Sequence, residues 1–301
     1  MNDHEFLDFQ PCLFMRCGHR QTVLGSTLPG GRFPYRARSR TLKLSDGDEL
    51  VVHDDIPASW KETDGVALLV HGLGGDHRSG YMVRVAAKLN RRGVRVFRMD
   101  QRGCGAAQWL SVQPAHAGRS DDIAEVLEWV EFCCPRAPLT LVGFSLGGNA
   151  VLKLAGERGE PAGGNLRSVL AVAPPIDLAY CAKNLARRER RFYDRRFVRK
   201  LCRQVRLRSQ RVAAARGLDP GVEPCSVLEF DDCYTAPVSG FQDAGDYYAR
   251  CSAGPLLSSI EVNTRILVAE DDPVVPVEIF SEVPVSEHVR LFKTRYGGHL
   301  G

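Results

Sequence analysis

The stretch 138–155 constrains this chain more than any other, because it places a serine between a strand and a helix. An apolar run over 138–142 leads into Gly143-Phe144-Ser145-Leu146-Gly147, and a helix-like run over 149–155 follows. In such a Gly-x-Ser-x-Gly turn the serine hydroxyl stands clear of the backbone at the end of a strand. The two glycines suit a turn in which a Cβ would clash. The stretch predicts a nucleophilic serine, although a glycine-rich turn that binds nothing can have the same five residues.

Apolar runs that suit buried strands alternate with helical patterns along most of the chain. Strands are expected at 65–70, 94–99, 168–173, 264–269 and 289–293, a hairpin at 40–53, and helices at 81–92 and 121–134. Such apolar strands are typical of sheets that are covered on both faces. The alternation therefore predicts an α/β protein with a mostly parallel central sheet and helices on both faces. Functional residues in such sheets gather at the carboxyl ends of the strands.

Two segments depart from the alternation. Residues 1–38 contain three prolines and no core-like run, so we expect an irregular segment that wraps around the rest. Residues 176–256 are helical, basic and rich in loops, and alternation resumes after them. We expect this second segment to be a helical cap insertion over the site. The whole chain, 1–301, is then a single domain, which its length allows.

Composition points to a globular protein of a reducing compartment. Apolar residues make up 44% and charged residues 25% of the 301 residues, and no apolar run approaches the roughly 20 residues that span a bilayer. The first residues lack the basic and apolar regions of a secretory signal. The ten cysteines are scattered, without a C-x-x-C pair, so neither a zinc site nor a redox motif is predicted. We expect a cytoplasmic protein, with Cys104 as a structural residue.

Positive charge is concentrated between residues 183 and 211, with thirteen Lys or Arg against two acids. The simplest interpretation is a cap helix with a solvated cationic face and an apolar face on the core. A second interpretation is peripheral contact with an anionic membrane surface, because Phe and Leu residues are interleaved with the charges. Binding of nucleic acid is the least favoured interpretation of this charge, because no recognised nucleic-acid motif accompanies it. Nucleic acid is therefore not expected as a partner.

Partners for Ser145 are found where such a nucleophile needs them. A serine hydroxyl requires a base, and a histidine with a pKa near about 6.5 suits that role when a carboxylate orients it. Asp271-Asp272-Pro273 follows the strand at 264–269, and His299 follows the strand at 289–293. Asp272 is preferred as the acid, because a residue before proline adopts extended backbone; Asp271 stays open as the alternative. The order serine, acid, histidine is the expected one.

The loop 71–75, His-Gly-Leu-Gly-Gly, suits an oxyanion-binding loop after a buried strand. Its Leu73 N–H and the Leu146 N–H are the predicted donors. A nucleotide-binding loop fits less well, because the third glycine at the required spacing is missing. We expect His71, Gly72, Phe144 and His116 to contact substrate.

His116 and Asp121 also form a His-x4-Asp pattern, which is known from glycerolipid acyltransferases. Asp121 is explained more simply as a residue at the start of a helix, where an acid favours the helix dipole.

Taken in order, these motifs resemble the α/β-hydrolase superfamily and, more narrowly, its YheT-like branch, which is related to the eukaryotic ABHD1/ABHD3 esterase and lipase group. The resemblance covers nearly the whole chain. Besides the motifs above, the resemblance rests on short sequence motifs at residues 19–22, 44–48, 102–105, 116–122, 173–178, 230–232, 240–241, 247–248 and 297–299.

The resemblance implies an α/β-hydrolase fold and a carboxylic ester hydrolase acting on short acyl esters or acylglycerols. It implies no cofactor and no metal, and a catalytic triad of Ser145, Asp272 and His299. An acyltransferase acting on lipid or alcohol acceptors, and a non-catalytic scaffold that binds lipids or partners, are the alternatives. Similar proteins continue past the Gly-Gly-His motif into a final helix. This sequence stops at Gly301, either because it is shortened or because the protein ends there. If the protein ends there, we expect the His299 loop to be weakly held.

Overall fold

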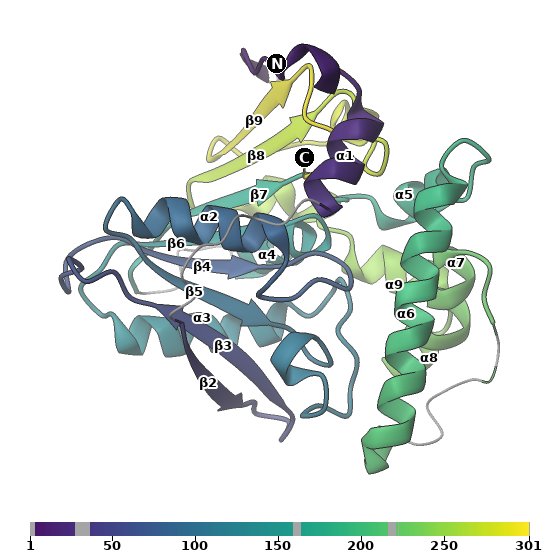
Figure 1. Ribbon diagram of the computed structural model, residues 1–301, viewed down its shortest axis with the longest axis horizontal. Coiled ribbons are helices and arrows are strands. Elements are labelled where there is room, and N and C mark those ends of the chain that lie inside the picture. Colours follow the sequence, from purple (N-terminus) through teal and green to yellow (C-terminus); the bar gives the residue numbers. More distant parts are fainter. Residues whose placement is uncertain (1–3, 28–36, 159–163, 216–220, 222, 301) are drawn as a thin grey trace.

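A nine-stranded sheet forms the centre of the protein, in the order β1-β9-β8-β7-β6-β4-β5-β3-β2 (Figure 1). The computed structural model describes residues 4–27, 37–158, 164–215, 221 and 223–300. The strands are β1 (His4–Leu7), β2 (Arg38–Lys43), β3 (Glu49–Asp55), β4 (Val66–Val70), β5 (Arg95–Asp100), β6 (Leu139–Phe144), β7 (Leu166–Val172), β8 (Thr264–Ala269) and β9 (Val289–Thr294). β3 pairs antiparallel with β2 and β5, and the other neighbours are parallel. The predicted mostly parallel sheet is confirmed.

Helices cover both faces of this sheet, because its central strands are apolar on both sides. They are α1 (Gly18–Thr27), α2 (Gly80–Asn90), α3 (Ser120–Cys133), α4 (Leu146–Arg158), α5 (Leu178–Leu185), α6 (Arg191–Arg211), α7 (Val227–Phe230), α8 (Ala236–Val238) and α9 (Ala244–Cys251). Leu68 and Val70 of β4 pack in one core cluster with residues of α3 and α4, whereas Leu69 packs in another with residues of α2. Alternate side chains of a strand point to opposite faces, so α2 lies opposite α3 and α4 (Figure 1).

The prediction of an irregular N-terminal segment over 1–38 is wrong for its described part. β1 adds a parallel edge strand beside β9, with His4 opposite Leu291, and α1 is a helix of ten residues. The strand is too short for its pattern to be read from sequence, and it forms only by pairing with β9, which lies almost the whole chain away. Residues 28–36, which include Pro29 and Pro34, lie outside the described residues.

The segment 176–256 is helical, as predicted, and the residues that the structure describes between β7 and β8 contain no strand. Helices α5 to α9 stand to one side of the sheet, with α6 the longest (Figure 1). The apolar side of α6 faces inward through Tyr193, Val198 and Val205, while Arg195 and Arg199 are exposed. No helix in the described part of the chain is long and apolar enough to cross a membrane. The description of this segment as a cap stays a prediction.

Candidate active site

Ser145 occupies a strained turn between β6 and α4. Its φ of +51° lies in the left-handed region, which costs a non-glycine residue about 1 to 3 kcal/mol and is tolerated where the surroundings impose it. The Ser145 N–H donates to the Val172 carbonyl oxygen at 2.8 Å. A Cβ on Gly143 would lie 2.3 Å from the Gly147 oxygen, and a Cβ on Gly147 would lie 2.4 Å from the His71 oxygen. Both glycines are therefore required by close backbone contact.

The structure brings Ser145, His299 and Asp272 together in one hydrogen-bonded chain. The distance from Ser145 Oγ to His299 Nε2 is 2.8 Å, and that from His299 Nδ1 to Asp272 Oδ2 is 2.9 Å. Because an ionised carboxylate can only accept, Nδ1 carries the ring proton and Nε2 accepts from the serine hydroxyl. His299 and Asp272 are 9% and 6% exposed. The arrangement can take a proton from Ser145 and stabilise the resulting imidazolium.

The two neighbouring aspartates have different partners, which separates their roles. The Oδ1 atom of Asp272 accepts from the N–H groups of Val274 and Val275 at 2.7 and 2.9 Å, which turns Oδ2 toward the histidine. Asp271 instead accepts from the Gly298 N–H at 2.8 Å and from the Gln21 amide at 3.2 Å. Of the two, only Asp272 contacts the His299 ring, and Asp271 ties the backbone of the histidine loop.

Helix α1 holds the loop that carries His299. The His299 N–H donates to Thr22 Oγ1 at 2.8 Å, and that hydroxyl donates to the Gly18 oxygen at 2.7 Å. A Cβ on Gly18 would lie 1.8 Å from the Asp271 oxygen, so α1 touches the aspartate loop as well. The expectation of a weakly held His299 loop is therefore wrong. The N-terminal segment supplies contacts that the sequence around His299 does not reveal.

The loop after β4 lies against the serine turn. A Cβ on Gly72 would lie 2.9 Å from Ser145 Cβ, so only glycine fits there. The backbone N–H groups of Leu73 and Leu146 donate no hydrogen bond within the residues that the structure describes, and Leu146 is the first residue of α4. Two free donors thus flank the serine, and the N-terminal end of a helix adds a positive dipole.

Two of the expected substrate contacts are placed in the interior. Phe144 packs against Tyr81 of α2, with ring centroids 5.0 Å apart, and lines none of the pockets described below. That expectation is wrong, because its side chain points into the core on the α2 face. His71 is 1% exposed; it bonds to the Gly72 oxygen through Nδ1 and accepts from the Gln101 N–H. Burial lowers the pKa of His71, so this ring is neutral and shapes the loop.

A buried cluster around Asp100, which the sequence analysis did not predict, holds the far end of the loop that begins at His71. Asp100 accepts from the His53 ring at 3.0 Å, the His77 ring at 2.6 Å, and the backbone N–H groups of His77 and Ala106. Burial acts to raise the pKa of Asp100, but these hydrogen bonds overcome it and hold the pKa well below its usual range. The carboxylate thereby fixes the end of the loop that begins at His71.

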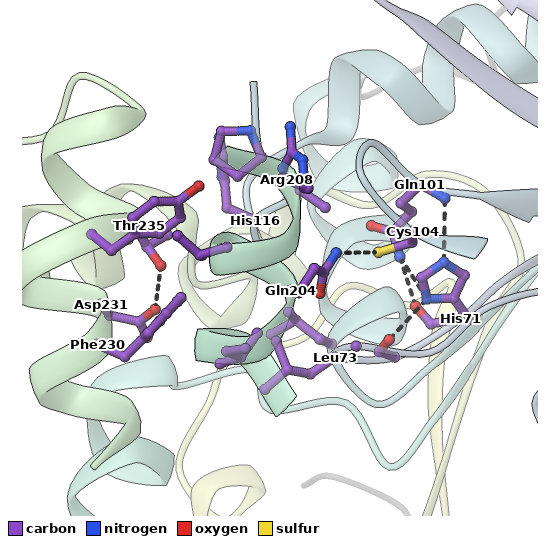
Figure 2. Close-up of a pocket in the computed structure, with 18 of the residues that line it drawn as sticks. His71, Leu73, Gln101, Cys104, His116, Gln204, Arg208, Phe230, Asp231 and Thr235 are labelled. Atoms are coloured by element: carbon purple, nitrogen blue, oxygen red, sulfur yellow. Dashed lines mark hydrogen bonds between the residues drawn. The ribbon is translucent and has the colours of Figure 1, made fainter. Parts of the chain in front are cut away.

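Three pockets surround the serine turn, and Leu73 lines all of them. The first, here called the serine pocket, contains Ser145 and His299, with Arg196 and Lys200 of α6 on its wall. The apolar pocket contains Ser145 and is lined by residues such as Leu178, Leu185, Phe197 and Val275. The third, here called the Arg208 pocket, lies beyond Leu73 and Leu146 and touches neither Ser145 nor His299 (Figure 2). The space around Ser145 thus has an apolar side and a cationic side.

His116 lines the Arg208 pocket and does not pair with Asp121. Its ring packs edge to face against Phe241 and Tyr247, whereas Asp121 is exposed in the first turn of α3. Burial, followed by the nearby cations Arg119, Lys153 and Arg102, lowers the pKa of His116 to about 3. A neutral ring without a carboxylate lacks the features of an acyltransferase base.

Comparison with known proteins agrees with this architecture. A family model described as alpha/beta hydrolase fold matches residues 66–301. YheT of Escherichia coli (strain K12) is 29% identical, over 89% of this chain and 78% of that protein. Medium-chain fatty acid ethyl ester synthase/esterase 2 of Saccharomyces cerevisiae is 26% identical over 91% and 64%, and phospholipase ABHD3 of Homo sapiens is 23% identical over 97% and 73%.

Solved structures of other hydrolases share the fold. The 2,6-dihydroxy-pseudo-oxynicotine hydrolase superposes with a TM-score of 0.59, at 18% identity, over 94% of this chain and 67% of that one. Est1E from Butyrivibrio proteoclasticus, with ferulic acid bound, superposes with a TM-score of 0.55, at 16% identity, over 87% and 91%. At these identities the likeness concerns the fold alone.

Proposed function

The chain belongs to the alpha/beta hydrolase family, and from that premise we propose that it cleaves carboxylic esters through an acyl-enzyme on Ser145. The observation that carries the proposal is the continuous hydrogen-bonded chain from Ser145 Oγ through His299 to Asp272, with distances of 2.8 and 2.9 Å. The same constellation on unrelated folds performs acyl transfer. The esterase and phospholipase names of the relatives point to the same reaction class.

In the first half-reaction His299 Nε2 takes the proton of Ser145 as Oγ attacks the ester carbonyl. The oxyanion accepts hydrogen bonds from the Leu73 and Leu146 N–H groups, and losing one such donor typically lowers turnover about 10²- to 10³-fold. His299 then gives its proton to the leaving alcohol, and the acyl group stays on Ser145. Water repeats the sequence and releases the acid. Asp272 stabilises the imidazolium in both halves.

The acyl group of the substrate lies in the apolar pocket, between Ser145 and the side chains of α5 and α6. Leu178, Leu185 and Phe197 there favour a hydrocarbon chain over a polar group. Short acyl esters and acylglycerols carry such chains. Because helices of the segment 176–256 supply this wall, we assign that segment as the cap of the site.

Hydrolysis of p-nitrophenyl esters of rising acyl length tests the proposal. We expect turnover with an optimum set by the apolar pocket, and none with Ser145→Ala, while the thermal midpoint of that variant stays near the wild-type value. An ester product appearing when glycerol is added would assign the acyl group to an alcohol acceptor instead of water. Absence of turnover from a folded protein with every ester would favour the binding-only scaffold.

The cationic face of α6 suggests where a lipid substrate meets the protein. Arg195 and Arg199 are exposed on this helix, and Phe192 is 62% exposed near its start. Basic and aromatic side chains together suit an anionic membrane surface. We expect binding to vesicles that contain phosphatidylglycerol, weakened by salt, and none to vesicles of phosphatidylcholine alone. Equal binding to both would contradict an electrostatic contact.

A further inference from the structure

The Arg208 pocket is separate from the catalytic residues but connected to them. It shares Leu73, Leu146, Asp231 and Tyr247 with the apolar pocket, and that pocket also contains Ser145. Nothing in the proposed hydrolysis uses its remaining wall. Most of that wall comes from α6 and the loop before α3 (Figure 2).

Arg208 is a buried cation whose charge is not matched by an acid. Its side chain is 3% exposed, and Nη2 donates to the backbone oxygens of Ser111 and Val112 at 2.7 and 3.0 Å. Its Nε–H has no hydrogen-bond partner. Within the described part of the chain no Asp or Glu forms an ion pair with it. A buried charge without a counterion is costly, so this wall favours an anion.

His116 adds a second free donor to the pocket. It is 9% exposed, and its Nδ1 accepts from the Gly118 N–H at 3.1 Å. The ring proton of a neutral imidazole is then on Nε2, and Nε2 has no partner among the residues that the structure describes. Figure 2 draws the His116 and Arg208 side chains at the same end of the pocket.

The other ionisable groups of the wall leave this end positive. Asp231 accepts from the Thr235 hydroxyl at 2.7 Å and the Tyr248 hydroxyl at 2.7 Å, and Figure 2 places it across the pocket from Arg208. Burial raises the pKa of Asp231 to about 6 and that of the Cys104 thiol to about 11. At neutral pH Cys104 is therefore an uncharged thiol, and the carboxylate lies at the far side.

We propose that the Arg208 pocket binds a carboxylate group carried on a short apolar chain. The carboxylate pairs with the Arg208 guanidinium and accepts from His116 Nε2–H, and the chain lies against Leu201, Val205 and Phe230. A guanidinium suits the planar carboxylate, and one cation balances one negative charge. Two sources supply this chemistry: a free carboxylate, such as the acid that ester hydrolysis releases, and a carboxylate at the far end of an ester's own acyl chain.

Calorimetric titration of the wild-type protein with hexanoate tests the binding itself, with hexan-1-ol as the neutral counterpart. We expect hexanoate to bind and hexan-1-ol to bind at least about tenfold more weakly, because a hydrogen bond to a charged group is worth that much. Arg208→Gln and His116→Phe should each weaken hexanoate about tenfold. Phenylalanine keeps the ring packing of His116. If Arg208→Gln does not fold, the loss of hexanoate binding in His116→Phe therefore tests the proposal on its own.

Arg203→Gln is the matched control, because Arg203 lies on the same helix, is exposed and loses the same charge. It should leave hexanoate binding unchanged. The proposal is overturned if hexanoate does not bind. It is equally overturned if His116→Phe leaves binding intact, or if Arg203→Gln weakens binding as much as Arg208→Gln does.

A second experiment distinguishes the two sources of the carboxylate, and it rests on the proposed ester hydrolysis. It compares p-nitrophenyl half-esters of succinate, adipate and suberate with the neutral esters of equal length. A KM lower by about tenfold for one half-ester, lost in His116→Phe, assigns the carboxylate to the substrate. Equal KM values at every length, with hexanoate still bound, assign it to a free acid. Because calorimetry needs no turnover, failure of the hydrolysis proposal is seen separately.

Discussion

The turn that carries Ser145 is held by the central strands of the sheet, whereas the loop that carries His299 is held by a helix from the other end of the chain. Gly143 and Gly147 pack closely within the β6–α4 turn and against His71 after β4, and the Ser145 N–H donates to Val172 of β7. The His299 N–H, by contrast, donates to Thr22, which lies 277 positions away. The serine side of the proposed catalytic hydrogen bond therefore rests on the sheet, and the histidine side depends on docking of α1. Substitutions on the two sides should fail in different ways.

The largest expected effect is a loss of kcat, and it should differ between the two aspartates beside the histidine loop. Asp272→Asn should lower kcat about 10⁴-fold, because the ring would lose the acceptor that fixes its tautomer. Asp271→Asn alters only the backbone ties to Gly298 and Gln21, so about a tenfold loss is expected from a small misplacement of the loop. Steady-state kinetics on p-nitrophenyl esters measures both. Losses of equal size would contradict the division of roles between the two residues.

The close approach of α1 predicts an intermediate effect on stability. Gly18→Ala would place a Cβ 1.8 Å from the Asp271 oxygen, and such overpacking typically lowers the free energy of unfolding by about 1 to 3 kcal/mol. Gly65→Ala is the control, because the nearest atom to its Cβ would be 3.8 Å away. Urea unfolding compares the two. A variant at Gly18 as stable as the control would show that α1 does not pack this tightly.

The smallest expected effect concerns the hydroxyl that holds the His299 backbone. Thr22→Val keeps the shape but leaves a buried N–H unpaired, so kcat should fall about tenfold while KM changes little. Thr22→Ser retains the acceptor and should restore most of the rate. Thr27→Val removes an exposed hydroxyl of the same helix, which donates to Val23, and should have no effect. An equal loss in the Thr22 and Thr27 variants would assign both to helix stability.

The same contrast explains what could be predicted from the sequence. The strand, serine turn and helix, the mostly parallel sheet and the acid and base candidates all rest on local patterns, since each follows the end of one apolar strand. The part played by α1 could not be predicted, because Gly18 and Thr22 gain their meaning only from residues near 271 and 298. Phe144 was misplaced for a related reason: adjacent residues of a strand face opposite sides, and the motif alone does not say which side holds substrate.

Labelling with a fluorophosphonate probe, followed by mass spectrometry of the peptides, tests the central claim most directly. The probe reacts with a serine only where a base and an oxyanion site activate it. We predict one label per chain, on Ser145, with none on the Ser145→Ala variant and a slower rate on Thr22→Val. A folded protein that stays unlabelled, or that is labelled at another residue, would contradict the account.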